Sequence, residues 1–588
     1  MTLAAARHGS AWARRPPCCP WPVARAILPG KRKGGPIAGA PIGRLRVTDS
    51  IGRFDYVIVG AGTAGCLLAN RLSEDSEVSV LLLEAGGRDD YLWIHIPVGY
   101  LYTMNNPRTD WCFRTEAEPG LNGRSLDYPR GKVLGGCSSI NGMIYMRGQA
   151  RDYDHWAQTG AKGWNWDKVL PYFRRSEDHY KGGSDLHGAG GEWRVEQQRL
   201  RWEILEAWRD AAVQAGIPAT DDFNGGDNEG VGYFEVNQRG GVRWSTAKAY
   251  LKPAMGRPNL TVMTKAQATA IRLDGRRVTG LDFLRDGVPS RVEVGGELIL
   301  AAGAVASPVL LQQSGIGPGA VLSEHGVETR HDLPGVGENL QDHLQVRAAF
   351  KVDGVRTLNR LANSLVGKAG MALEYALKRS GPLSMAPSQL GCFAKSDPSR
   401  ETPNLQYHVQ PLSTDRLGDP LHRFDAFTAS VCNLRPQSRG HVRLRSPDPM
   451  AKPVIRPNYL SDPADRQVAA RALMLTRRIA EQPALQAYNA REFKPGADIQ
   501  GEEALARAAG DIASTIFHPV GTCKMGPAAD EAAVVDERLR LHGIEALRVV
   551  DASIMPTITS GNTNSPTLMI AEKGAAMIRA DRKARAAA

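Results

Sequence analysis

A short apolar run that ends in a glycine-rich turn constrains the fold of this chain more than any other feature. The run covers 54–59 and is typical of a buried strand, and Gly60-Ala61-Gly62-Thr63-Ala64-Gly65 follows it as a G-x-G-x-x-G turn. A helical stretch over 66–72 and a second apolar strand over 78–83 lead to Glu84. This order predicts an α/β fold with a Rossmann-like, dinucleotide-binding domain.

Each part of this unit has a chemical task. Gly60, Gly62 and Gly65 permit a tight turn, a close backbone approach to a pyrophosphate, and close packing of helix on strand. The helix N-terminus offers free amides and the positive end of its dipole to the phosphates. Glu84, which follows Gly65 by 19 residues, is suited to accept hydrogen bonds from ribose hydroxyls. The unit alone does not distinguish NAD from FAD.

Five later segments are dense in glycine, serine or asparagine, or carry an isolated histidine. They are YPRGKVLGGCSSING at 128–142, GAVASPVLLQQSGIG at 303–317 after an apolar strand at 297–302, HPVGTCKMG at 518–526, VVDAS at 549–553 and GNTNSP at 561–566. In order and spacing these segments resemble the glucose–methanol–choline (GMC) oxidoreductases, flavoenzymes that oxidise alcohols. The resemblance runs from about 54 to 578 and is strongest to the choline dehydrogenase-like, FAD-dependent alcohol dehydrogenase branch.

The resemblance implies that the cofactor is FAD, in an extended pose with its adenosine end on 60–84. It also implies that the loop 131–142 passes along the pyrophosphate and flavin, and that 551–552 lie near the ribityl and phosphate groups. The cofactor-binding residues expected from the fingerprint and the resemblance are Gly60, Gly62, Thr63, Ala64, Gly65, Glu84, Ala85, Arg130, Gly131, Val133, Gly135, Gly136, Ser138, Asn141, Gly142, Asp551, Ala552, Asn562, Pro566 and Thr567.

The same resemblance predicts two domains. The FAD-binding domain is expected to be discontinuous, formed by 54–155, 236–330 and 540–580. The substrate-binding domain is expected from 156–235 and 331–539, built on a large, mostly antiparallel sheet backed by helices. Residues 1–53 are expected to form a basic, disordered extension and 581–588 a basic tail.

Alcohol oxidation requires a base for the hydroxyl proton, while flavin N5 takes the hydride. Histidine suits this task because its pKa lies near neutral pH, and the resemblance places His518 at the flavin edge. Asn562 falls at the family's second catalytic position, where its amide is expected to orient the alcohol oxygen. A register slip of two residues would put Asn564 there instead.

A helix is predicted over 566–578, with Pro566 in its first turn. The resemblance places the start of this helix beneath the flavin pyrimidine ring. The positive end of its dipole would favour negative charge on the flavin during hydride transfer.

Two departures from the family pattern bear on chemistry. Some members attach FAD covalently through a histidine just before the loop asparagine, but this chain has Ile140 before Asn141, which predicts non-covalent FAD. Choline-acting members need a site for a quaternary ammonium group. The neutral Gln389 stands near the position of an acid in such members, which favours a primary alcohol with an uncharged body. Choline dehydrogenase, an oxygen-using alcohol oxidase and a cyanohydrin lyase remain alternatives.

The net charge of +11 indicates nothing about substrate, because it resides at the two ends of the chain. Residues 1–53 carry ten basic side chains and one acidic side chain, and residues 579–588 carry four basic side chains and one acidic side chain. Residues 54–578 therefore have a net charge of about −1. Nucleic-acid binding is therefore not expected. The segment 1–53 has no uninterrupted apolar stretch of a secretory signal; a mitochondrial transit peptide and a start codon placed too early are alternatives.

The eight cysteines are scattered and show neither disulfide nor metal spacing, so no metal site is predicted. This cysteine pattern favours a reducing compartment, the cytoplasm, with at most peripheral membrane association through the basic ends. The expected partners are an alcohol and a quinone or redox-carrier acceptor, with the chain as a monomer or homodimer.

Overall fold

The computed structural model describes residues 49–416 and 418–587. Residues 1–48 of the predicted extension lie outside the described residues, whereas residues 49–53 are described. Strand β1 spans Asp49–Val59 rather than starting at 54. The longer strand forms because β13, Val288–Leu300, provides parallel pairing partners as far back as Ser290 and Arg291. Residues 49–53 are therefore part of the folded unit.

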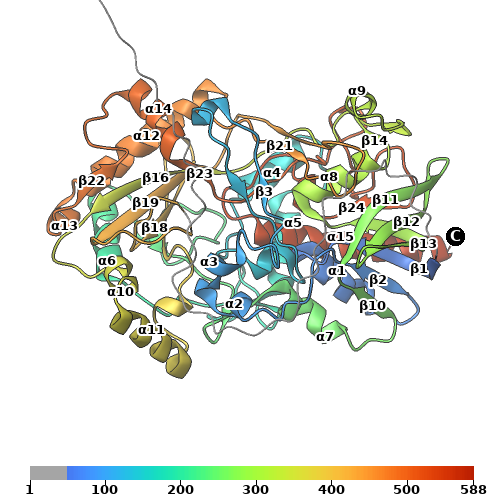
Figure 1. Cartoon of the computed structure of the whole chain (residues 1–588), viewed down its shortest axis with the longest axis horizontal. Helices are drawn as coiled ribbons and strands as arrows, with labels where there is room; N and C mark the ends of the chain where they lie inside the picture. Colours follow the sequence, from blue (N-terminus) through green and yellow to red (C-terminus); the bar gives the residue numbers. More distant parts are fainter. Residues whose placement is uncertain (1–48, 417, 588) are drawn as a thin grey trace, which may run out of the picture. The chain divides into compact units, whose positions relative to one another are not determined.

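The first sheet has the order β10-β2-β1-β13-β12-β11, and β24 also pairs with β13 (Figure 1). Its strands are β1, β13, β2 Val80–Leu83, β10 Leu260–Met263, β11 Ala266–Asp274, β12 Arg277–Arg285 and β24 Leu547–Val549. Strands β10, β2, β1, β13 and β24 are parallel, whereas β12 pairs antiparallel with both β13 and β11. The carboxyl ends of the parallel strands therefore meet at one edge, where open α/β sheets bind ligands.

Helices cover this sheet and begin at the same edge. They include α1, Thr63–Leu72, and α8, Gly303–Gln313, each of which starts within a few residues of a parallel strand's end. The C-terminal helix α15 spans Asn564–Ala587 and packs on α1.

Helix α15 is longer than the predicted 566–578, and it includes most of the predicted basic tail. Ion pairs explain the extension: Asp581 pairs with Arg548, Arg582 with Asp75, and Arg585 with Glu297. The basic side chains at 582 and 585 are thus paired with acids of the folded unit.

The second sheet is antiparallel throughout and has the order β22-β16-β19-β18-β17-β7, with β23 pairing β16. Its strands are β7 Gly230–Tyr233, β16 Leu344–Lys351, β17 Leu390–Ala394, β18 Leu405–Gln410, β19 Ala426–Asn433, β22 Arg491–Lys494 and β23 Ala513–Thr515. Helices α6 Glu203–Gln214, α12 Pro463–Ala480 and α14 Glu502–Ile512 pack on this sheet and share a hydrophobic core with it. The first sheet has a separate core, which confirms the predicted two-part α/β architecture.

The remaining helices and strands are mostly short. They are α2 Leu92–His95, α3 Tyr100–Thr103, α4 Ala150–Gln158, α5 Trp166–Ser176, α7 Lys252–Ala254, α9 Gly319–Glu324, α10 Leu358–Ala362, α11 Leu365–Lys378, α13 Pro483–Gln486, β3 Phe113–Arg114, β4 Asp127–Tyr128, β5 Glu177–His179, β6 Trp193–Val195, β8 Gln238–Arg239, β9 Val242–Arg243, β14 Ile316–Gly317, β15 His331–Asp332, β20 His441–Arg443 and β21 Val454–Arg456. Within the described ranges, we find no helix with the length and apolar character needed to span a bilayer.

Candidate active site

A cavity of about 470 Å³ lies at the carboxyl ends of the parallel strands and reaches β18 of the antiparallel sheet. The predicted site residues that line it come from six separate stretches of sequence. The predicted site residues that line it are Gly60, Gly62, Thr63, Ala64, Glu84, Ala85, Arg130, Gly131, Gly136, Asn141, Gly142, His518, Asp551, Ala552, Asn562 and Thr567.

Five residues predicted to bind the cofactor do not line this cavity: Gly65, Val133, Gly135, Ser138 and Pro566. They lie behind its wall and hold it in place. The Ser138 hydroxyl donates to the Gly135 carbonyl oxygen at 2.6 Å, which closes the glycine-rich loop on itself. Val133 is fully buried.

The N-terminus of α1 fits an anionic phosphate group. Gly62 caps the helix without any side-chain hydrogen bond to its first amides, and the first turn carries no acid. Gly136 (φ 51°) lies so close to Gly62 that a Cβ on Gly136 would come within 2.6 Å of the Gly62 Cα. The two loops thus form a cradle of exposed amides around a space that only glycines leave open.

Two polar side chains complete this half of the cavity. Glu84 accepts hydrogen bonds from the Ala61 and Gly86 amides, at 2.9 and 2.8 Å, and burial raises the pKa of Glu84 to about 7. The carboxyl group retains lone pairs that can accept from ribose hydroxyls. Asn564 has a buried amide nitrogen without a protein partner and also lines the cavity. These donor and acceptor groups fit a bound dinucleotide.

Replacing Gly65 by Ala is expected to destabilise the fold and to lower FAD content. The new Cβ would lie 1.8 Å from the Gly60 carbonyl oxygen, so α1 must move away from β1; overpacking of this kind costs about 1–3 kcal/mol. Thermal unfolding and the ratio of flavin to protein absorbance measure both effects. Gly256→Ala is the matched control, because no atom lies within 4 Å of its new Cβ. Equal flavin content in the two variants would contradict this role.

The two predicted catalytic side chains are in contact. The Asn562 amide nitrogen lies 3.1 Å from His518 Nε2, and the Asn562 oxygen accepts from Gln406 Nε2 of β18 at 3.2 Å. This second bond fixes the orientation of the Asn562 amide, so its NH₂ group points at His518. Asn564 instead accepts from the Thr63 hydroxyl at 2.7 Å, so Asn562 is the asparagine of this segment that contacts His518.

His343, which the sequence analysis did not identify, determines the tautomer of His518. His343 Nε2 lies 3.2 Å from the Leu434 carbonyl oxygen, which only accepts, so Nε2 carries the proton. His343 Nδ1 is then an acceptor, and it lies 3.0 Å from His518 Nδ1. His518 must therefore donate through Nδ1, which leaves an unprotonated Nε2 beside Asn562.

Burial keeps these imidazoles neutral. It lowers the pKa of His518 well below 6.5, an effect reinforced by His343, His408 and Arg130 nearby. Burial also lowers the pKa of His343 to about 4. His518 Nε2 is therefore unprotonated at neutral pH, as a general base requires.

The backbone at His518 is held by a buried carboxylate and an arginine. Asp342 accepts from the His518 amide at 2.7 Å and from the Thr515 hydroxyl at 2.6 Å. Arg130 of the glycine-rich loop donates to the Phe517 carbonyl at 2.7 Å. Phe517 has φ 70°, a conformation that is unfavourable for an aromatic residue and persists only where its surroundings enforce it.

The signal that identifies Asp342 and His343 is present in the sequence. The polar run Asn339-Leu340-Gln341-Asp342-His343 follows a glycine-rich turn and directly precedes the alternating apolar residues of β16. Polar side chains at the end of a buried strand indicate a site. Their contact with His518 depends on antiparallel pairing of β16 with β23, which the sequence does not reveal.

Gln389, on which the expectation against choline rested, is fully buried and does not line the cavity. Its neighbours Pro387 and Ser388 do. Among the described lining residues the only carboxylates are Glu84 and Asp551, and both accept hydrogen bonds from backbone amides. Asn562, in contact with His518, and Gln410 contribute neutral amides to the lining.

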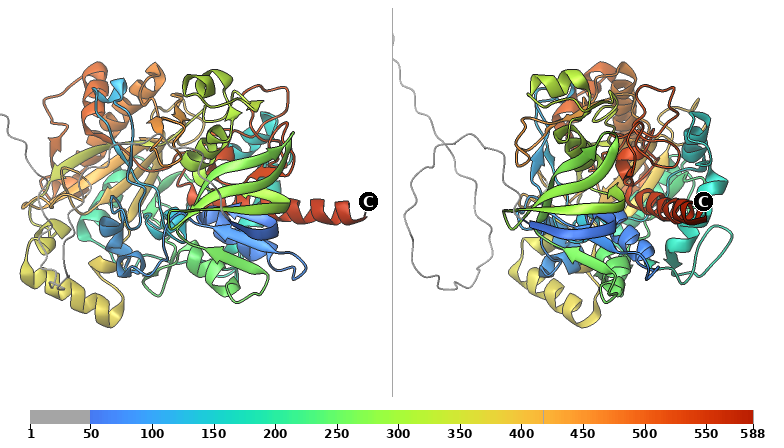
Figure 2. Two further views of the ribbon diagram at one scale, coloured as in Figure 1. Left: turned by 45° about the vertical axis from the view of Figure 1, so that its right-hand side comes forward. Right: turned by 90° about the vertical axis from the view of Figure 1, so that its right-hand side faces the viewer.

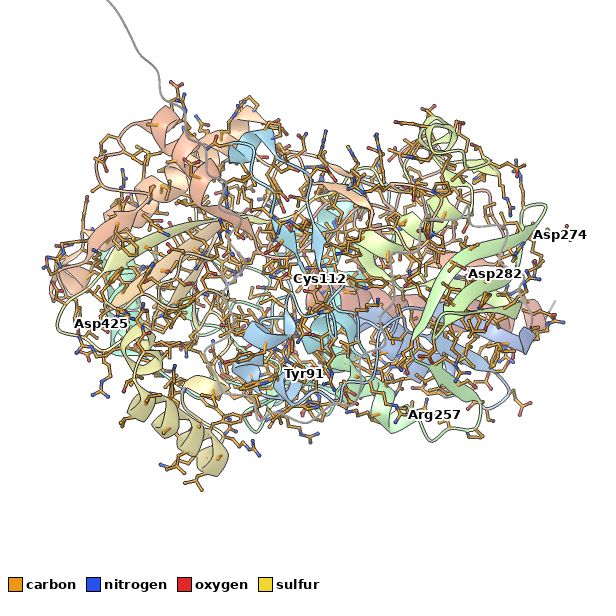
Figure 3. All side chains as sticks on the ribbon, in the orientation of Figure 1. Tyr91, Cys112, Arg257, Asp274, Asp282 and Asp425 are labelled. Carbon is orange, nitrogen blue, oxygen red and sulfur yellow. The ribbon has the colours of Figure 1, made fainter. Side chains whose placement is uncertain are left out.

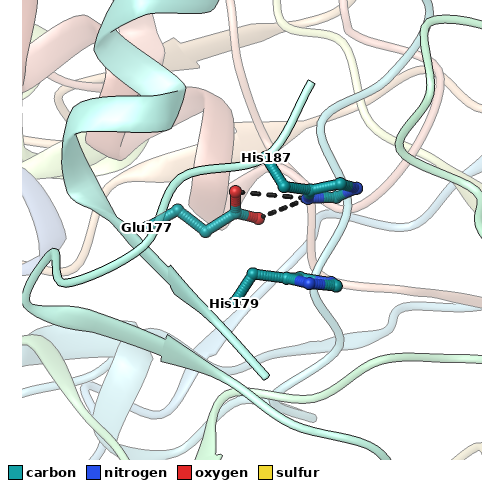
Figure 4. A group of neighbouring side chains, drawn as sticks. All are labelled: Glu177, His179 and His187. Atoms are coloured by element: carbon teal, nitrogen blue, oxygen red, sulfur yellow. Dashed lines mark hydrogen bonds and ion pairs between the residues drawn. The ribbon is translucent and has the colours of Figure 1, made fainter. Parts of the chain in front are cut away.

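A second group of titratable side chains lies outside the cavity, where Glu177, His179 and His187 bring ligand-type atoms within 4.8 Å of one another (Figure 4). Protein partners occupy these atoms. Glu177 accepts from Arg147 at 2.6 Å and from His187 at 3.0 Å, and the other His187 nitrogen contacts Asp222 at 3.0 Å. Metal binding requires a neutral imidazole. The geometry is that of a buried ion-pair network, which joins α5–β5 to the loop before β7.

The network is expected to make stability depend on pH. Burial opposes protonation, but hydrogen bonds to Asp222 and Glu177 raise the pKa of His187 to about 9. Its stabilising contribution is therefore complete below about pH 6.5 and is lost as pH rises through 9. The Tm difference between wild type and His187→Gln should be largest at pH 6 and shrink towards pH 10. The exposed His155→Gln is the control, and a pH-independent difference for His187→Gln would refute the assignment.

Comparisons with known proteins agree with this geometry. The two family models described as GMC oxidoreductase match residues 54–345 and 436–571. An alcohol dehydrogenase (acceptor) of Pseudomonas putida is 41% identical over 529 residues, which cover 89% of this chain and 95% of that protein. The mitochondrial choline dehydrogenase of Homo sapiens is 40% identical over 570 residues, or 95% of each chain.

Solved structures show the same fold. A pyridoxine 4-oxidase from Mesorbium loti superposes with a TM-score of 0.81 at 33% identity, covering 89% of this chain and 98% of that one. A formate oxidase of Aspergillus oryzae has a TM-score of 0.84 at 27% identity, covering 91% and 100%. The family models and the relatives cover most of the chain, the motifs fall on the cavity, and the chain belongs to the GMC oxidoreductase family.

Proposed function

We propose that this chain oxidises a primary alcohol to an aldehyde, with FAD bound non-covalently in the cavity and a quinone or other carrier as electron acceptor. The observation that carries the proposal is the unprotonated His518 Nε2 beside the Asn562 amide, at the end of a cavity built for a dinucleotide. Bound FAD supplies the acceptor for the hydride.

The chain's own residues handle the hydroxyl group. His518 Nε2 accepts the hydroxyl proton, and the Asn562 NH₂ group donates to the alcohol oxygen and orients it. The His518 imidazolium that results keeps its Nδ1–H bond to His343, whose Nδ1 lone pair stabilises the positive charge. The N-terminal turn of α15 lines the cavity through Asn564 and Thr567 and favours negative charge that develops there.

The loop around the glycine-rich segment supports non-covalent binding. Ile140 lines the cavity where a covalently linked relative has its histidine, and a hydrocarbon side chain forms no bond to flavin. Asn141 is held by Arg243, whose Nη1 donates to it at 2.9 Å. Retention of FAD then depends on the cradle at α1 and on Glu84.

A primary alcohol with an uncharged body fits the site better than choline. A quaternary ammonium group is stabilised by aromatic faces and a carboxylate. The only carboxylates of the described lining, Glu84 and Asp551, are engaged by backbone amides, and the cation Arg130 lies near enough to His518 to lower its pKa. This lining, and not Gln389, is the reason to favour an uncharged alcohol over choline. Choline is the second candidate, because proteins named choline dehydrogenase are about 40% identical to this chain.

Steady-state rates with a dye acceptor distinguish the two substrates. We expect kcat/KM for a medium-chain primary alcohol to exceed that for choline by at least about tenfold, which corresponds to about 1.4 kcal/mol of transition-state binding. A preference for choline would reverse the assignment. Peroxide measured in the same assays tests the acceptor: a dehydrogenase forms little peroxide and depends on the dye, whereas fast peroxide formation without dye identifies an oxidase.

A further inference from the structure

Helix α11 exposes an apolar face to solvent instead of burying it. Of its 14 residues, only Tyr375 is buried. The exposed fractions are 83% for Leu365 and Val366, 61% for Leu373 and 74% for Leu377. Isolated exposed apolar residues are ordinary on a protein surface, but a helix that exposes a contiguous apolar stripe marks an interaction site.

These side chains lie on one side of the helix. At about 100° per residue they occupy an arc of roughly 140°, which we call the α11 face. Its members are Leu365, Val366, Ala369, Ala372, Leu373, Ala376 and Leu377. The charged residues of α11 fall outside this arc. A surface helix normally turns its apolar stripe to the core, and α11 has the opposite orientation.

The opposite side of α11 is firmly attached, so the exposure is a property of the fold. The Tyr375 hydroxyl donates to the Gly241 carbonyl oxygen at 3.0 Å, and the Ser364 hydroxyl caps the Gly367 amide at 3.2 Å. Upstream, Asp425 (labelled in Figure 3) accepts from the Thr357 amide at 3.0 Å and fixes the start of α10. Figures 1 and 2 show α11 standing out from the antiparallel half of the unit.

The segment that carries the α11 face has a positive net charge, in contrast to the nearly neutral body, although one of its bases, Arg360, is paired with Asp425. The stretch 356–379 has one acid, Glu374, against five bases. These are Arg356, Arg360, Lys368, Lys378 and Arg379. An apolar face bordered by basic residues is the composition of helices that lie in the headgroup region of anionic bilayers.

A second copy of this chain is a poorer occupant. A helix of 14 residues is about 21 Å long and about 10 Å wide, so its exposed face offers roughly 200 Å². A stable interface needs about 800 Å² from each partner. Two α11 helices in contact would also bring their basic side chains together.

We propose that α11 docks this enzyme on the surface of an anionic lipid bilayer, with the α11 face among the acyl chains and the basic residues at the headgroups. The chain after α11 reaches the cavity-lining Pro387 and Ser388 within ten residues. Docking therefore places the cavity wall near the bilayer, where apolar alcohols and quinones concentrate. The docking itself does not depend on the proposed reaction.

The test is co-flotation of the FAD-loaded full chain with vesicles of phosphatidylcholine containing about one-third phosphatidylglycerol. The variant Leu365→Gln, Val366→Gln, Leu373→Gln, Leu377→Gln changes only exposed side chains. Its matched control is Val213→Gln, Met255→Gln, Val288→Gln, Met474→Gln, which alters four exposed apolar residues elsewhere, none of which lines the cavity. Every protein retains the basic N-terminal segment, so any vesicle binding by that segment is common to all.

We expect the wild type and the control to bind the anionic vesicles, and the α11 variant to bind at least tenfold more weakly with unchanged dye-linked activity. Binding should also weaken on pure phosphatidylcholine and at high salt. Equal binding of all three proteins would overturn the proposal. A wild-type dimer that the α11 variant converts to a monomer, with vesicle binding unchanged, would assign the face to a second copy instead.

Discussion

Replacing His518 by Ala is expected to lower kcat/KM for the alcohol by between about 10²- and 10⁴-fold, the range for loss of a positioned general base. The methyl group has no lone pair for the hydroxyl proton, and no other group in contact with Asn562 can replace it. Asp342 still holds the backbone of this loop through the amide of residue 518. Flavin content and Tm should therefore stay close to wild type.

Steady-state kinetics with a dye acceptor measure this effect, with flavin absorbance recorded on the same samples. The exposed His155→Ala, on helix α4, is the matched control and should retain wild-type rates. If His518→Ala kept activity within tenfold of the wild type while FAD remained bound, His518 would not be the base.

Replacing His343 by Leu is expected to reduce kcat by about 10²-fold, although His343 lies one side chain away from the alcohol. Without the His343 Nδ1 acceptor, the His518 Nδ1–H is left buried and unpaired, which costs about 1–3 kcal/mol. The other tautomer of His518 avoids that cost, but it places the proton on Nε2, the atom that must accept the hydroxyl proton. A wrong tautomer at an intact catalytic histidine is known to be severely damaging in hydrolases.

His343→Gln distinguishes this effect from simple damage to the core. The Gln oxygen can accept from His518 Nδ1, and its NH₂ group can donate to the Leu434 carbonyl, so both bonds have replacements. We expect His343→Gln to recover activity to within about tenfold of the wild type, with KM little changed in either variant. An equal loss of kcat in the Leu and Gln variants would show that the His518 tautomer does not explain the effect.

The sequence predicted the cofactor half of the molecule because the elements of its dinucleotide-binding motif are consecutive in the chain. Strand, turn, helix and acid follow one another over 54–84, and the backbone places Gly62 and Glu84 on one cavity without help from distant residues. The ends of β1 and α15 were misjudged. Pairing with β13 extends the first, and ion pairs from Asp581 extend the second; both are tertiary contacts that local pattern does not contain.

The catalytic half was predicted by resemblance and only in part. His518 and Asn562 were identified from their motifs, but their supporting residues were not. His343 directly precedes β16 and Gln406 lies on β18, and the neighbours of both strands in the sheet include segments far away in sequence. Gln389 lies just before β17 and is fully buried, whereas its neighbour Ser388 lines the cavity, so an error of one position in the sequence exchanges cavity for core.

Anaerobic rapid mixing of the FAD-loaded enzyme with a medium-chain primary alcohol tests the central claim most directly. The claim is that His518 accepts the hydroxyl proton as the alcohol reduces the bound flavin. Flavin absorbance should bleach within a single turnover in the wild type, and it should bleach at least about 10²-fold more slowly in His518→Ala. A wild-type spectrum that no alcohol bleaches, or equal bleaching rates in the two proteins, would contradict the account.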